Sequence, residues 1–438
     1  MNVLLVGSGA REHAIARAIN KSNIDHRLFC FASNRNPGIV KLAKKLKIGN
    51  INSPIDVSNF AIKHSIDLAI IGPEAPLANG VVDTLLENKI KCVGPSKELA
   101  QLETSKGFTR NLMNKHNING CPDFRCFNSI DGVPEYLNDL GKNYVIKFDG
   151  LMGGKGVKVS GEHLHSHNEA IDYCNEIISS SGKFVVEEKL IGEEFSLMSF
   201  CDGDNLIHMP PVQDHKRAYE NDTGPNTGGM GSYNDVNQSL PFLNEEDIRA
   251  GQQINISIAS ALKKEFGIGY KGILYGGFIA TADGVKVIEY NARFGDPEAM
   301  NLFSLFEGDF LELCLSIANG TLDNYKAIFS NKATVCKYAV PNGYPDSPIK
   351  DEQIDVSQVK HHENLYYASV DIKDDNLIES GSRTVAMVGI ADTLVEAEKI
   401  VQSEIEKIKG PLFHRKDIGT EQLVNKRIDH MKEIRGEF

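Results

Sequence analysis

The segment Tyr144–Val159 constrains the fold most strongly, because two short strand patterns flank a glycine-rich loop within it. Tyr144–Phe148 has the alternation of a strand, and Val157–Val159 resumes that pattern after the loop. Glycines let backbone N–H groups approach an anion closely, and neighbouring lysines add positive charge. The sequence therefore predicts a hairpin whose loop lies on phosphates, and an ordinary glycine-rich hairpin with solvated lysines is the alternative. The residues concerned are Lys147, Gly150, Gly153, Gly154, Lys155 and Gly156.

This loop differs from the phosphate loop of the P-loop NTPases. Lys155 is followed by Gly156 instead of serine or threonine, and no strong helix pattern begins directly behind it. The sequence therefore argues against a P-loop NTPase.

The first twenty residues have the pattern of a strand, a glycine turn and a helix. Val3–Val6 is continuously apolar, and Ala10–Asn20 places its apolar residues on one helical face. A helix N-terminus behind a glycine turn can hold a phosphate, so Gly7, Gly9 and Arg11 are candidates for an anion site. We expect a βαβ unit at the start of the chain.

Binding of a dinucleotide at this unit has little support. The third glycine of the dinucleotide fingerprint is missing, and the strand pattern Arg27–Ala32 is not followed by an acidic residue. Ile66–Ile71 and Lys91–Val93 are further strand patterns that end in Gly-Pro loops. Ligands bind at the carboxyl ends of parallel strands, so Glu74 in the first of these loops is a candidate, with a solvated loop acid as the alternative.

Composition favours a soluble protein with small partners. The chain has 438 residues, 41% of them hydrophobic and 24% charged, and a net charge of −12. That charge argues against a general nucleic-acid or membrane-surface binder. The eight cysteines include no CxxC pair, and the N-terminus enters a strand pattern without a basic leader. We expect a cytoplasmic protein with reduced thiols.

The stretch from Pro210 to Tyr233 is unusually rich in glycine and in mixed charges. It contains Gln-Asp-His-Lys-Arg, including Asp214, and then Thr-Gly-Pro-Asn-Thr-Gly-Gly-Met-Gly. Long loops inside a compact domain are binding loops or disordered segments. The mixture of charges favours the binding of a small charged molecule.

Gly272–Asn291 is predicted to form a hairpin that turns at Asp283-Gly284. Alternation along its second strand places Val287, Glu289 and Asn291 on one face. Glu289 and Asn291 are then neighbouring oxygen donors of the kind that Mg²⁺ prefers.

Arg293 follows that strand directly, within Ala-Arg-Phe-Gly-Asp-Pro-Glu. Its guanidinium can form paired hydrogen bonds with phosphate or carboxylate oxygens at the same end of the strand. A salt bridge at the strand end is the alternative.

Taken in order, these motifs resemble the ATP-grasp ligases, and more narrowly the phosphoribosylamine–glycine ligase family. The resemblance covers about residues 6 to 419. It is carried by Val-Gly-Ser-Gly-Ala-Arg-Glu-His, Gly-Pro-Glu-Ala-Pro-Leu, Glu-Glu-Lys-Leu-Ile-Gly-Glu-Glu, Gln-Asp-His-Lys-Arg, Thr-Gly-Pro-Asn-Thr-Gly-Gly-Met-Gly, Asn-Ala-Arg-Phe-Gly-Asp-Pro-Glu and Arg-Lys-Asp-Ile-Gly.

The resemblance implies a multidomain α/β (α+β) fold. The expected parts are an N-terminal Rossmann-like domain (1–121), an ATP-grasp small lobe with the glycine-rich loop (122–192), an ATP-grasp large lobe with the metal strand (193–330) and a small C-terminal α/β domain (331–438).

The resemblance also implies a reaction, the second step of purine biosynthesis. ATP is the co-substrate: the carboxylate of glycine attacks its γ-phosphate to give glycyl phosphate. The amine of 5-phosphoribosylamine then displaces phosphate and forms glycinamide ribonucleotide. The expected metal ion is Mg²⁺ or Mn²⁺. We expect a monomer with no nucleic-acid or membrane partner.

Site residues follow from the matching motifs. ATP is expected at Lys106, Lys147, Gly153, Gly154, Lys155, Gly156, Glu187, Glu188, Leu190 and Glu194. Glycine, acyl phosphate and phosphoribosylamine are expected at Gly9, Glu74, Asp214, Gly229, Arg293 and Asp296. The metal is expected at Glu289 and Asn291, and the catalytic residues are Arg293, Lys147 and Asp214.

One departure from the ATP-grasp pattern concerns the strand before the metal strand. Many of these ligases carry a further acidic metal ligand there, but Gly276 is expected to pair with Asn291 in this chain. Three competing classes remain. They are a sibling ATP-grasp ligase with another acid or amine, a dinucleotide-dependent oxidoreductase, and a nucleotide-binding regulator without catalysis.

Overall fold

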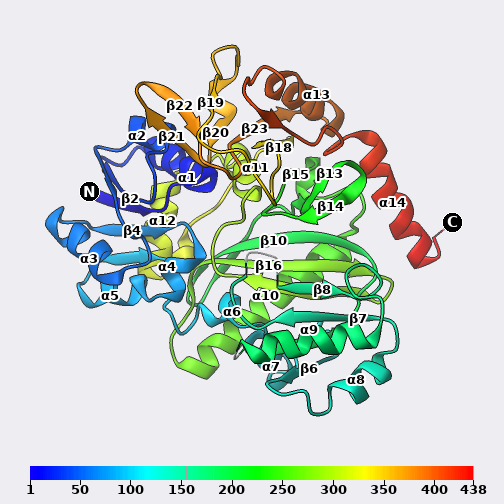
Figure 1. Ribbon diagram of the computed structural model, residues 1–438. Helices are drawn as coiled ribbons and strands as arrows, with labels where there is room; N and C mark the ends of the chain where they lie inside the picture. The colour runs from blue at the N-terminus through cyan, green and yellow to red at the C-terminus, as the bar shows by residue number, and fades with distance from the viewer. Residues whose placement is uncertain (153–155, 181, 438) are drawn as a thin grey trace.

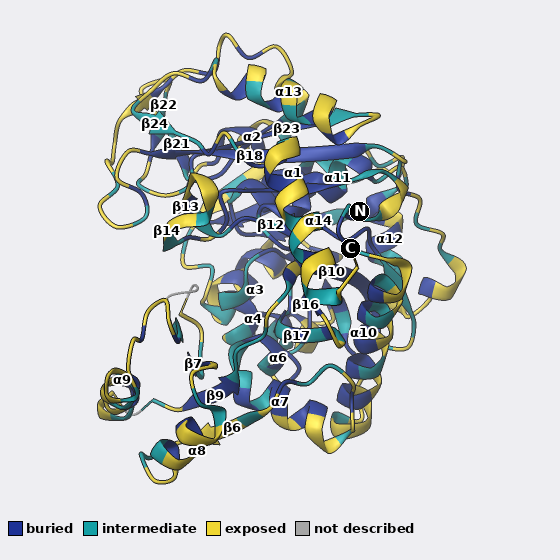
Figure 2. Cartoon of the chain, turned by 90° about the vertical axis from the view of Figure 1, so that its right-hand side faces the viewer, coloured by how far each residue is buried: buried dark blue, intermediate teal, exposed yellow. Residues whose placement is uncertain are grey.

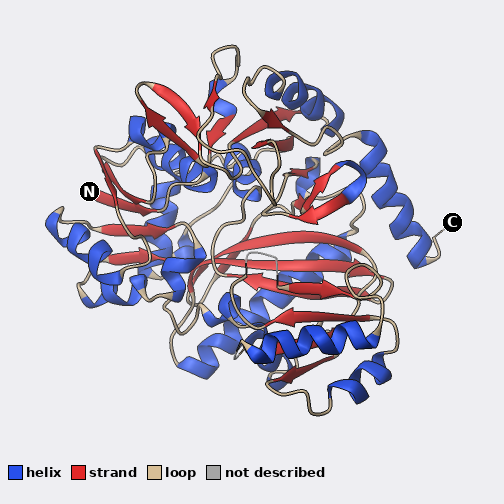
Figure 3. Ribbon diagram, viewed as in Figure 1, coloured by secondary structure: helices blue, strands red, loops and turns tan. Residues whose placement is uncertain are grey.

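The computed structural model describes residues 1–152, 156–180 and 182–437, which form a mixed α/β protein of several sheets (Figures 1 and 3). The expected α/β multidomain fold is confirmed. No helix within these residues combines the length and the apolar character needed to cross a membrane.

The first unit is a parallel five-stranded sheet with the order β3-β2-β1-β4-β5. Residues Val3–Val6 of β1 and Leu68–Ile71 of β4 are buried, as expected for strands covered on both faces. The Rossmann-like βαβ arrangement is therefore confirmed. Its elements are β1 (Asn2–Val6), α1 (Ala10–Asn20), β2 (Arg27–Ala32), α2 (Pro37–Leu42), β3 (Lys45–Ile48), α3 (Pro54–Lys63), β4 (Leu68–Ile71), α4 (Glu74–Ala78), α5 (Val81–Glu87) and β5 (Lys91–Val93).

Two short helices lead from this unit to the next, where the sequence pattern predicts a single helix over 99–116. The chain breaks at Ser105, whose backbone is extended and whose side chain accepts a hydrogen bond from the N–H of Phe108. This is the geometry of a helix N-cap. The helices are α6 (Gln101–Thr104) and α7 (Lys106–Lys115).

The small lobe is an antiparallel sheet with the order β6-β9-β7-β8, covered by two helices. It has its own hydrophobic core, separate from that of the remaining chain. Figure 2 shows it at one edge of the molecule. Its elements are β6 (Phe124–Phe127), α8 (Val133–Leu140), β7 (Tyr144–Phe148), β8 (Val157–Val159), α9 (His167–Ser179) and β9 (Phe184–Glu188).

The large lobe contains a four-stranded antiparallel sheet with the order β11-β10-β16-β17. Helix α10 packs on it, and the Asn255 amide donates to the carbonyl of Leu197. The elements are β10 (Glu193–Asp202), β11 (Leu206–His208), α10 (Glu245–Phe266), β16 (Lys271–Thr281), β17 (Gly284–Asn291), α11 (Glu298–Leu305) and α12 (Phe310–Asn319).

The last unit shares a sheet with residues from the 193–330 range. Its order is β12-β15-β18-β23-β20, with β24 paired to β18. The predicted boundary after residue 330 thus falls between strands of one sheet, because β12 and β15 precede it and β18, β23 and β20 follow it. The four domain ranges stay predictions. The elements are β12 (Gln213–Asp214), β13 (Arg217–Tyr219), β14 (Thr223–Asn226), β15 (Gly231–Asn234), β18 (Ala333–Pro341), β19 (Gln353–Ile354), β20 (Leu365–Tyr367), β21 (Val370–Lys373), β22 (Asn376–Glu379), β23 (Val385–Ala391), α13 (Leu394–Ile405), β24 (Leu412–Phe413) and α14 (Glu421–Arg435).

The register of the β16–β17 hairpin corrects the prediction that Gly276 pairs with Asn291. Thr281 pairs with Gly284, so the turn is centred one residue earlier than expected, and a β-bulge follows between Gly277 and Phe278. Tyr275 therefore lies opposite Asn291.

The bulge also changes which side chains of β17 share a face. Val287 and Tyr290 are buried in the core, whereas Ile288 and Glu289 both line a pocket. The predicted face of Val287, Glu289 and Asn291 is therefore wrong for Val287, because one extra residue at a bulge interrupts the alternation. Glu289 and Asn291 remain neighbours beyond the bulge.

Candidate active site

Lys147 lies at a meeting point of the two lobes. Its Nζ atom is 2.7 Å from Oε2 of Glu187 and donates to the carbonyl of Ile288 at 3.0 Å. Arg110 of α7 donates to both carboxylate oxygens of Glu187, at 2.7 and 2.9 Å, and to the carbonyls of Val287 and Ile288. One buried carboxylate thus holds the side chains of Lys147 and Arg110 against β17, the strand predicted to bind the metal ion.

The electrostatics of this cluster follow from its burial. Burial alone would raise the pKa of Glu187, but Arg110 and Lys147 lower that pKa to about 2. Burial lowers the pKa of Lys147, and Glu187 opposes this effect. The carboxylate is therefore the group that keeps a lysine ammonium in a water-poor position.

Lys106 begins α7 and reaches the start of the glycine-rich loop. Its Nζ atom donates to the carbonyl of Gly150 at 3.1 Å. Asp149 receives hydrogen bonds from Ser105 Oγ and from the N–H of Gly107, both at 3.1 Å. Gly156, at the end of the loop, has no room for a side chain, since a Cβ atom there would lie 2.9 Å from Phe148 Cβ. The predicted loop residues Gly153, Gly154 and Lys155 lie outside the described residues.

The remaining residues predicted to contact ATP lie where the chain passes from small to large lobe. Glu187 and Glu188 end β9, Leu190 is in the turn that follows, and Glu194 is the second residue of β10. The Glu188 side chain accepts from the N–H of Asp123 at 3.0 Å. These positions stay predictions, and Glu187 in addition makes the buried ion pairs described above.

A pocket opens between β10, β12, β16 and β17. Its lining includes Glu194, Asp214, Lys216, Ile288 and Glu289. Lys216 Nζ lies 3.5 Å from Glu194 Oε2 and 3.9 Å from Glu289 Oε1. Burial opposes ionisation of Glu289, but Lys216, Lys106 and Lys147 lower its pKa below the usual range. The pocket thus places Lys216 between the carboxylates of Glu194 and Glu289.

Arg293 contacts residues of both β17 and the N-terminal unit. It lies 3.3 Å from Glu74 and 3.1 Å from Glu103, and its Nη2 atom donates to Asn291 Oδ1 at 3.3 Å. Burial would raise the pKa of Glu74, but Arg293 and Arg11 lower it to about 2. The structure therefore brings Glu74 to Arg293 and Asn291, although Glu74 lies 219 positions from Arg293 in the sequence.

Asp214 faces a compact corner made by Gly229, Tyr275 and Glu298. A Cβ atom on Gly229, whose φ is +110°, would lie 2.7 Å from Asp214 Oδ1. Tyr275 donates its hydroxyl to Glu298 Oε1 at 2.5 Å. Burial, followed by the charge of Glu298, raises the pKa of Asp214 well above its usual value. Asp214 Oδ1 is buried and has no hydrogen-bond partner among the described residues.

Asp296 and Gly9 meet beside this corner. A Cβ atom on Gly9 would lie 3.8 Å from Asp296 Oδ2. Asp296 accepts from the Tyr338 hydroxyl at 2.6 Å and pairs with Arg383 at 3.2 Å. The N–H of Gly9 donates to Glu12 at 2.6 Å. Gly9, Asp296, Gly229 and Asp214 thus form a series of neighbours that ends at the pocket lined by Asp214.

The anion-site candidate Arg11 takes a different place. It pairs with Glu12 at 2.6 Å and donates to the carbonyl of Phe294, and it is only 7% exposed. These contacts join α1 to the loop after β17. The Arg11 side chain is therefore used in contacts within the protein, between α1 and the loop after β17.

The sequence patterns did not indicate that Arg110, Glu103 and Glu298 belong to the candidate site. Arg110 follows Lys106 by four residues, so the helical period places both on neighbouring positions of α7. Glu298 is the last residue of the motif Asn-Ala-Arg-Phe-Gly-Asp-Pro-Glu. Nothing in the local sequence indicates Glu103, whose contacts with Ala292 and Arg293 span nearly two hundred residues.

Comparisons with known proteins find relatives over nearly the whole chain. Models of the phosphoribosylglycinamide synthetase family match in three parts: the N domain at residues 1–103, the ATP-grasp (A) domain at 104–299 and the C domain at 334–421. The phosphoribosylamine–glycine ligase of Methanosarcina barkeri is 48% identical over 436 residues, covering 100% of both chains. That of Methanocaldococcus jannaschii is 48% identical over 445 residues, covering 99% of this chain and 100% of the relative.

Solved structures give the same result. The phosphoribosylamine–glycine ligase of Thermotoga maritima superimposes with a TM-score of 0.82 at 28% identity, covering 95% of this chain and 100% of the other. The biotin carboxylase domain of Hydrogenobacter thermophilus 2-oxoglutarate carboxylase, solved with MgADP, has a TM-score of 0.70 at 15% identity, with coverage of 100% and 95%, and shows a shared fold. The chain belongs to the phosphoribosylamine–glycine ligase family.

Proposed function

We propose that the chain is an ATP-dependent ligase that joins glycine to 5-phospho-D-ribosylamine and gives glycinamide ribonucleotide, ADP and phosphate. The carboxylate of glycine takes the γ-phosphoryl group of ATP to form glycyl phosphate. The amine of phosphoribosylamine then attacks the activated carbonyl carbon and displaces phosphate. This is the second step of purine biosynthesis.

The observation that carries the proposal is the contact between the small lobe and the metal strand. Lys147 donates to the carbonyl of Ile288, directly before Glu289. This contact supports a site in which Lys147 would bind a phosphate of ATP and Glu289 a metal ion. Phosphoryl transfer to a carboxylate needs alignment and charge neutralisation more than a strong base. Lys106 approaches the same place from α7.

The residues at β17 fit a divalent cation. Glu289 and Asn291 offer a carboxylate and an amide oxygen on neighbouring positions, the donors that Mg²⁺ and Mn²⁺ accept. The lowered pKa of Glu289 keeps that carboxylate ionised. The bound cation would help to neutralise charge on the phosphate oxygens of ATP.

The corner of Asp214, Gly229 and Glu298 suits the amino group of glycine. An ammonium group placed here would offset the burial and the charge of Glu298 that raise the pKa of Asp214, and Asp214 Oδ1 has no hydrogen-bond partner among the described residues. Arg293 supplies the positive charge for the carboxylate end and for the phosphoryl group it receives. Asp296, Gly9 and Glu74 lie on the side from which phosphoribosylamine would approach.

The test is phosphate release from ATP and Mg²⁺ with glycine and freshly generated phosphoribosylamine. Mixtures lacking each component serve as controls, and alanine replaces glycine in a further mixture. Release that requires both glycine and the amine, with glycinamide ribonucleotide formed, supports the ligase. Release with another acid or amine in their place would point to a sibling ligase, and ATP binding without release would contradict catalysis.

A further inference from the structure

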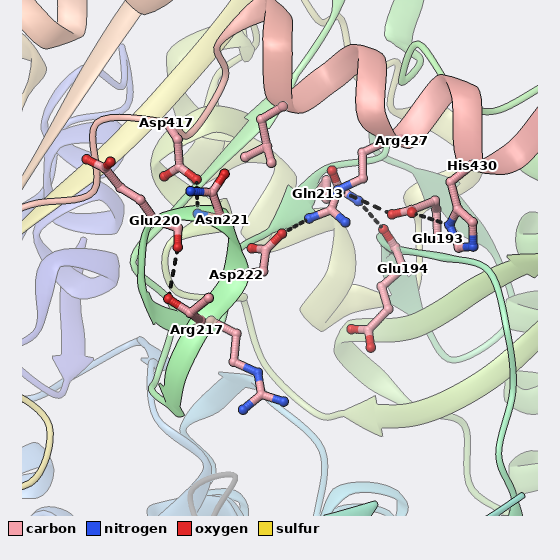
Figure 4. A network of polar contacts seen from close by, with 12 residues as sticks. Glu193, Glu194, Gln213, Arg217, Glu220, Asn221, Asp222, Asp417, Arg427 and His430 are labelled. Atoms are coloured by element: carbon pink, nitrogen blue, oxygen red, sulfur yellow. Dashed lines mark hydrogen bonds and ion pairs between the residues drawn. The ribbon is translucent and has the colours of Figure 1, made fainter. Parts of the chain in front are cut away.

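A network of charged side chains joins the C-terminal helix α14 to two segments that contribute Glu194 and Lys216 to the lining of the pocket (Figure 4). Arg427 of α14 pairs with Glu193 Oε2 through Nε at 3.3 Å and with Asp222 through Nη2. The exposed fractions of these three side chains are 17%, 5% and 23%. His430, one turn further along α14, contacts Glu193 Oε1 at 2.6 Å. One helix therefore holds both the start of β10 and the β13–β14 hairpin.

A second arginine fixes the tip of that hairpin. Arg415, only 1% exposed, pairs with Asp222 at 3.0 Å and with Asp417 at 2.7 Å, and it donates to the carbonyl of Arg217. The N–H of Asn221 donates to Asp417 at 2.8 Å. Asn221 and Asp222 have φ values of +59° and +56°, which side chains other than glycine adopt at a cost. The hairpin tip thus keeps its conformation through contacts with the C-terminal segment.

Both anchored segments carry residues of the cleft. Glu193 and Glu194 are adjacent on β10, and alternate side chains of a strand point to opposite faces. Glu193 turns toward α14, whereas Glu194 points away from that helix in Figure 4. Lys216, which lies directly before β13, contacts Glu194 and Glu289 at 3.5 and 3.9 Å. A shift of either segment would move this pair.

We propose that Arg427 is a positioning residue for nucleotide binding, which holds Glu194 and Lys216 in place from behind the cleft. The inference rests on the proposed function, since it requires ATP in this cleft. Removing the arginine leaves Glu193 with His430 and Asp222 with Arg415, so each carboxylate loses one of its contacts with α14 or the C-terminal segment. A largely buried carboxylate with fewer charge partners is destabilised, so the start of β10 and the hairpin shift.

The test compares Arg427→Met with Arg435→Met in the full-length chain. Arg435 lies on the same helix and pairs with Asp247 of α10 at 2.7 Å; 12% of the Arg435 side chain and 4% of the Asp247 side chain are exposed. Helix α10 contributes no residue to the lining of the pocket. Isothermal titration calorimetry measures the Kd for Mg·ATP, and the melting temperature reports stability. We expect Arg427→Met to weaken binding about tenfold or more and Arg435→Met about twofold or less, at comparable losses of melting temperature.

Two further variants separate positioning from general damage. In a Glu194→Gln background, Arg427→Met should add little to the loss of affinity, because both act through the same contact. Glu193→Gln keeps the side-chain shape but removes the charge that Arg427 holds, and it should weaken binding about threefold or more. It decides the matter should Arg427→Met yield no folded protein.

The outcomes distinguish the inference from the function on which it rests. A wild-type chain that fails to bind Mg·ATP overturns both. A wild-type chain that binds Mg·ATP, together with equal affinities for Arg427→Met and Arg435→Met, overturns the positioning role alone. Fully additive losses in Arg427→Met and Glu194→Gln, or an unchanged Kd in Glu193→Gln, would also overturn it.

Discussion

At the scale of single residues, Arg293 connects several groups of the candidate site. It contacts Glu74, Glu103 and Asn291, the last of which is proposed to bind the metal ion. Two carboxylates next to one guanidinium raise its pKa further, so it stays charged at every working pH. Its position suits a charge that develops during transfer of the phosphoryl group.

We therefore expect Arg293→Ala to lower kcat by about 100-fold or more and to change the Kd for Mg·ATP by less than about threefold. Steady-state kinetics with a direct binding measurement checks this split. Arg293→Lys is the matched control, because it keeps the charge but loses the paired geometry and should recover part of kcat. Equal losses in kcat and in ATP affinity would show that Arg293 only binds nucleotide.

The Glu187 cluster makes a prediction about acid stability. The pKa of Glu187 is about 2 in the folded chain and 4.5 in the reference state, so its contribution is present above about pH 4.5 and is lost as pH falls toward 2. Between about pH 5 and pH 3, the wild type should lose about 2 kcal/mol more unfolding free energy than Glu187→Gln. Urea unfolding across that range measures the difference.

The matched control for this prediction is Glu245→Gln. Glu245 pairs with Arg249 on the exposed face of α10, with 83% and 72% of the two side chains exposed. Such a pair contributes little to stability, so this variant should follow the wild-type pH dependence. Parallel pH curves for wild type and Glu187→Gln would contradict the role assigned to the buried cluster.

At the scale of elements, local sequence predicts the site strands well. β7 and β8 occupy the predicted residues, because alternation and flanking glycines mark their ends. The break at Ser105 was not predicted, since a serine inside an apolar helical pattern does not show whether it caps a new helix. The bulge in β17 was not predicted either, because it depends on pairing with β16.

The candidate site was predictable as a set of motifs but not as a set of contacts. The resemblance selects Lys147, Glu289 and Arg293 as site residues, and their roles stay predictions; the structure places Lys147 on the carbonyl of Ile288, next to Glu289 in the chain. The resemblance gives no indication that Arg110 pairs with Glu187, because that contact joins residues 77 positions apart, one on α7 and one on β9 of the small lobe. Contacts of this kind depend on how the lobes pack, which no local pattern encodes.

Helix α7 yields the prediction at this scale. Asp149 receives hydrogen bonds from Ser105 Oγ and from the N–H of Gly107, so it attaches the N-terminus of α7, with Lys106, to the glycine-rich loop. Asp149→Ala should weaken Mg·ATP binding about fivefold to tenfold, because Lys106 loses its fixed position. Isothermal titration calorimetry provides the measurement.

Ser53→Ala serves as the control for Asp149→Ala. Ser53 caps α3 in the N-terminal unit by accepting from the N–H of Asp56, and its loss should cost about 1 kcal/mol of stability. ATP affinity should not change in this variant. An unchanged Kd for Asp149→Ala would contradict the link between α7 and the loop.

At the scale of the whole molecule, most buried apolar residues that the structure describes belong to one of two separate cores. One core runs from Val3 of the N-terminal unit to Met431 of α14 and includes both the large lobe and the C-terminal sheet. The small lobe has its own cluster of buried residues between Val133 and Val186. Since its core is much smaller, the small lobe has fewer buried apolar contacts to resist local opening.

We therefore expect the small lobe to open as a unit at lower free energy than the remaining chain. In hydrogen–deuterium exchange, amides of β6, β7 and β9 should exchange faster than those of β1 and β16, which lie in the larger core. Mg·ATP should slow exchange in the small lobe selectively, because Lys147 and the glycine-rich loop lie there while Lys106 joins it from α7. Equal rates in both sets of strands without nucleotide would mean that the charged contacts of Arg110 and Lys147 with β17 unite the two cores into one cooperative unit.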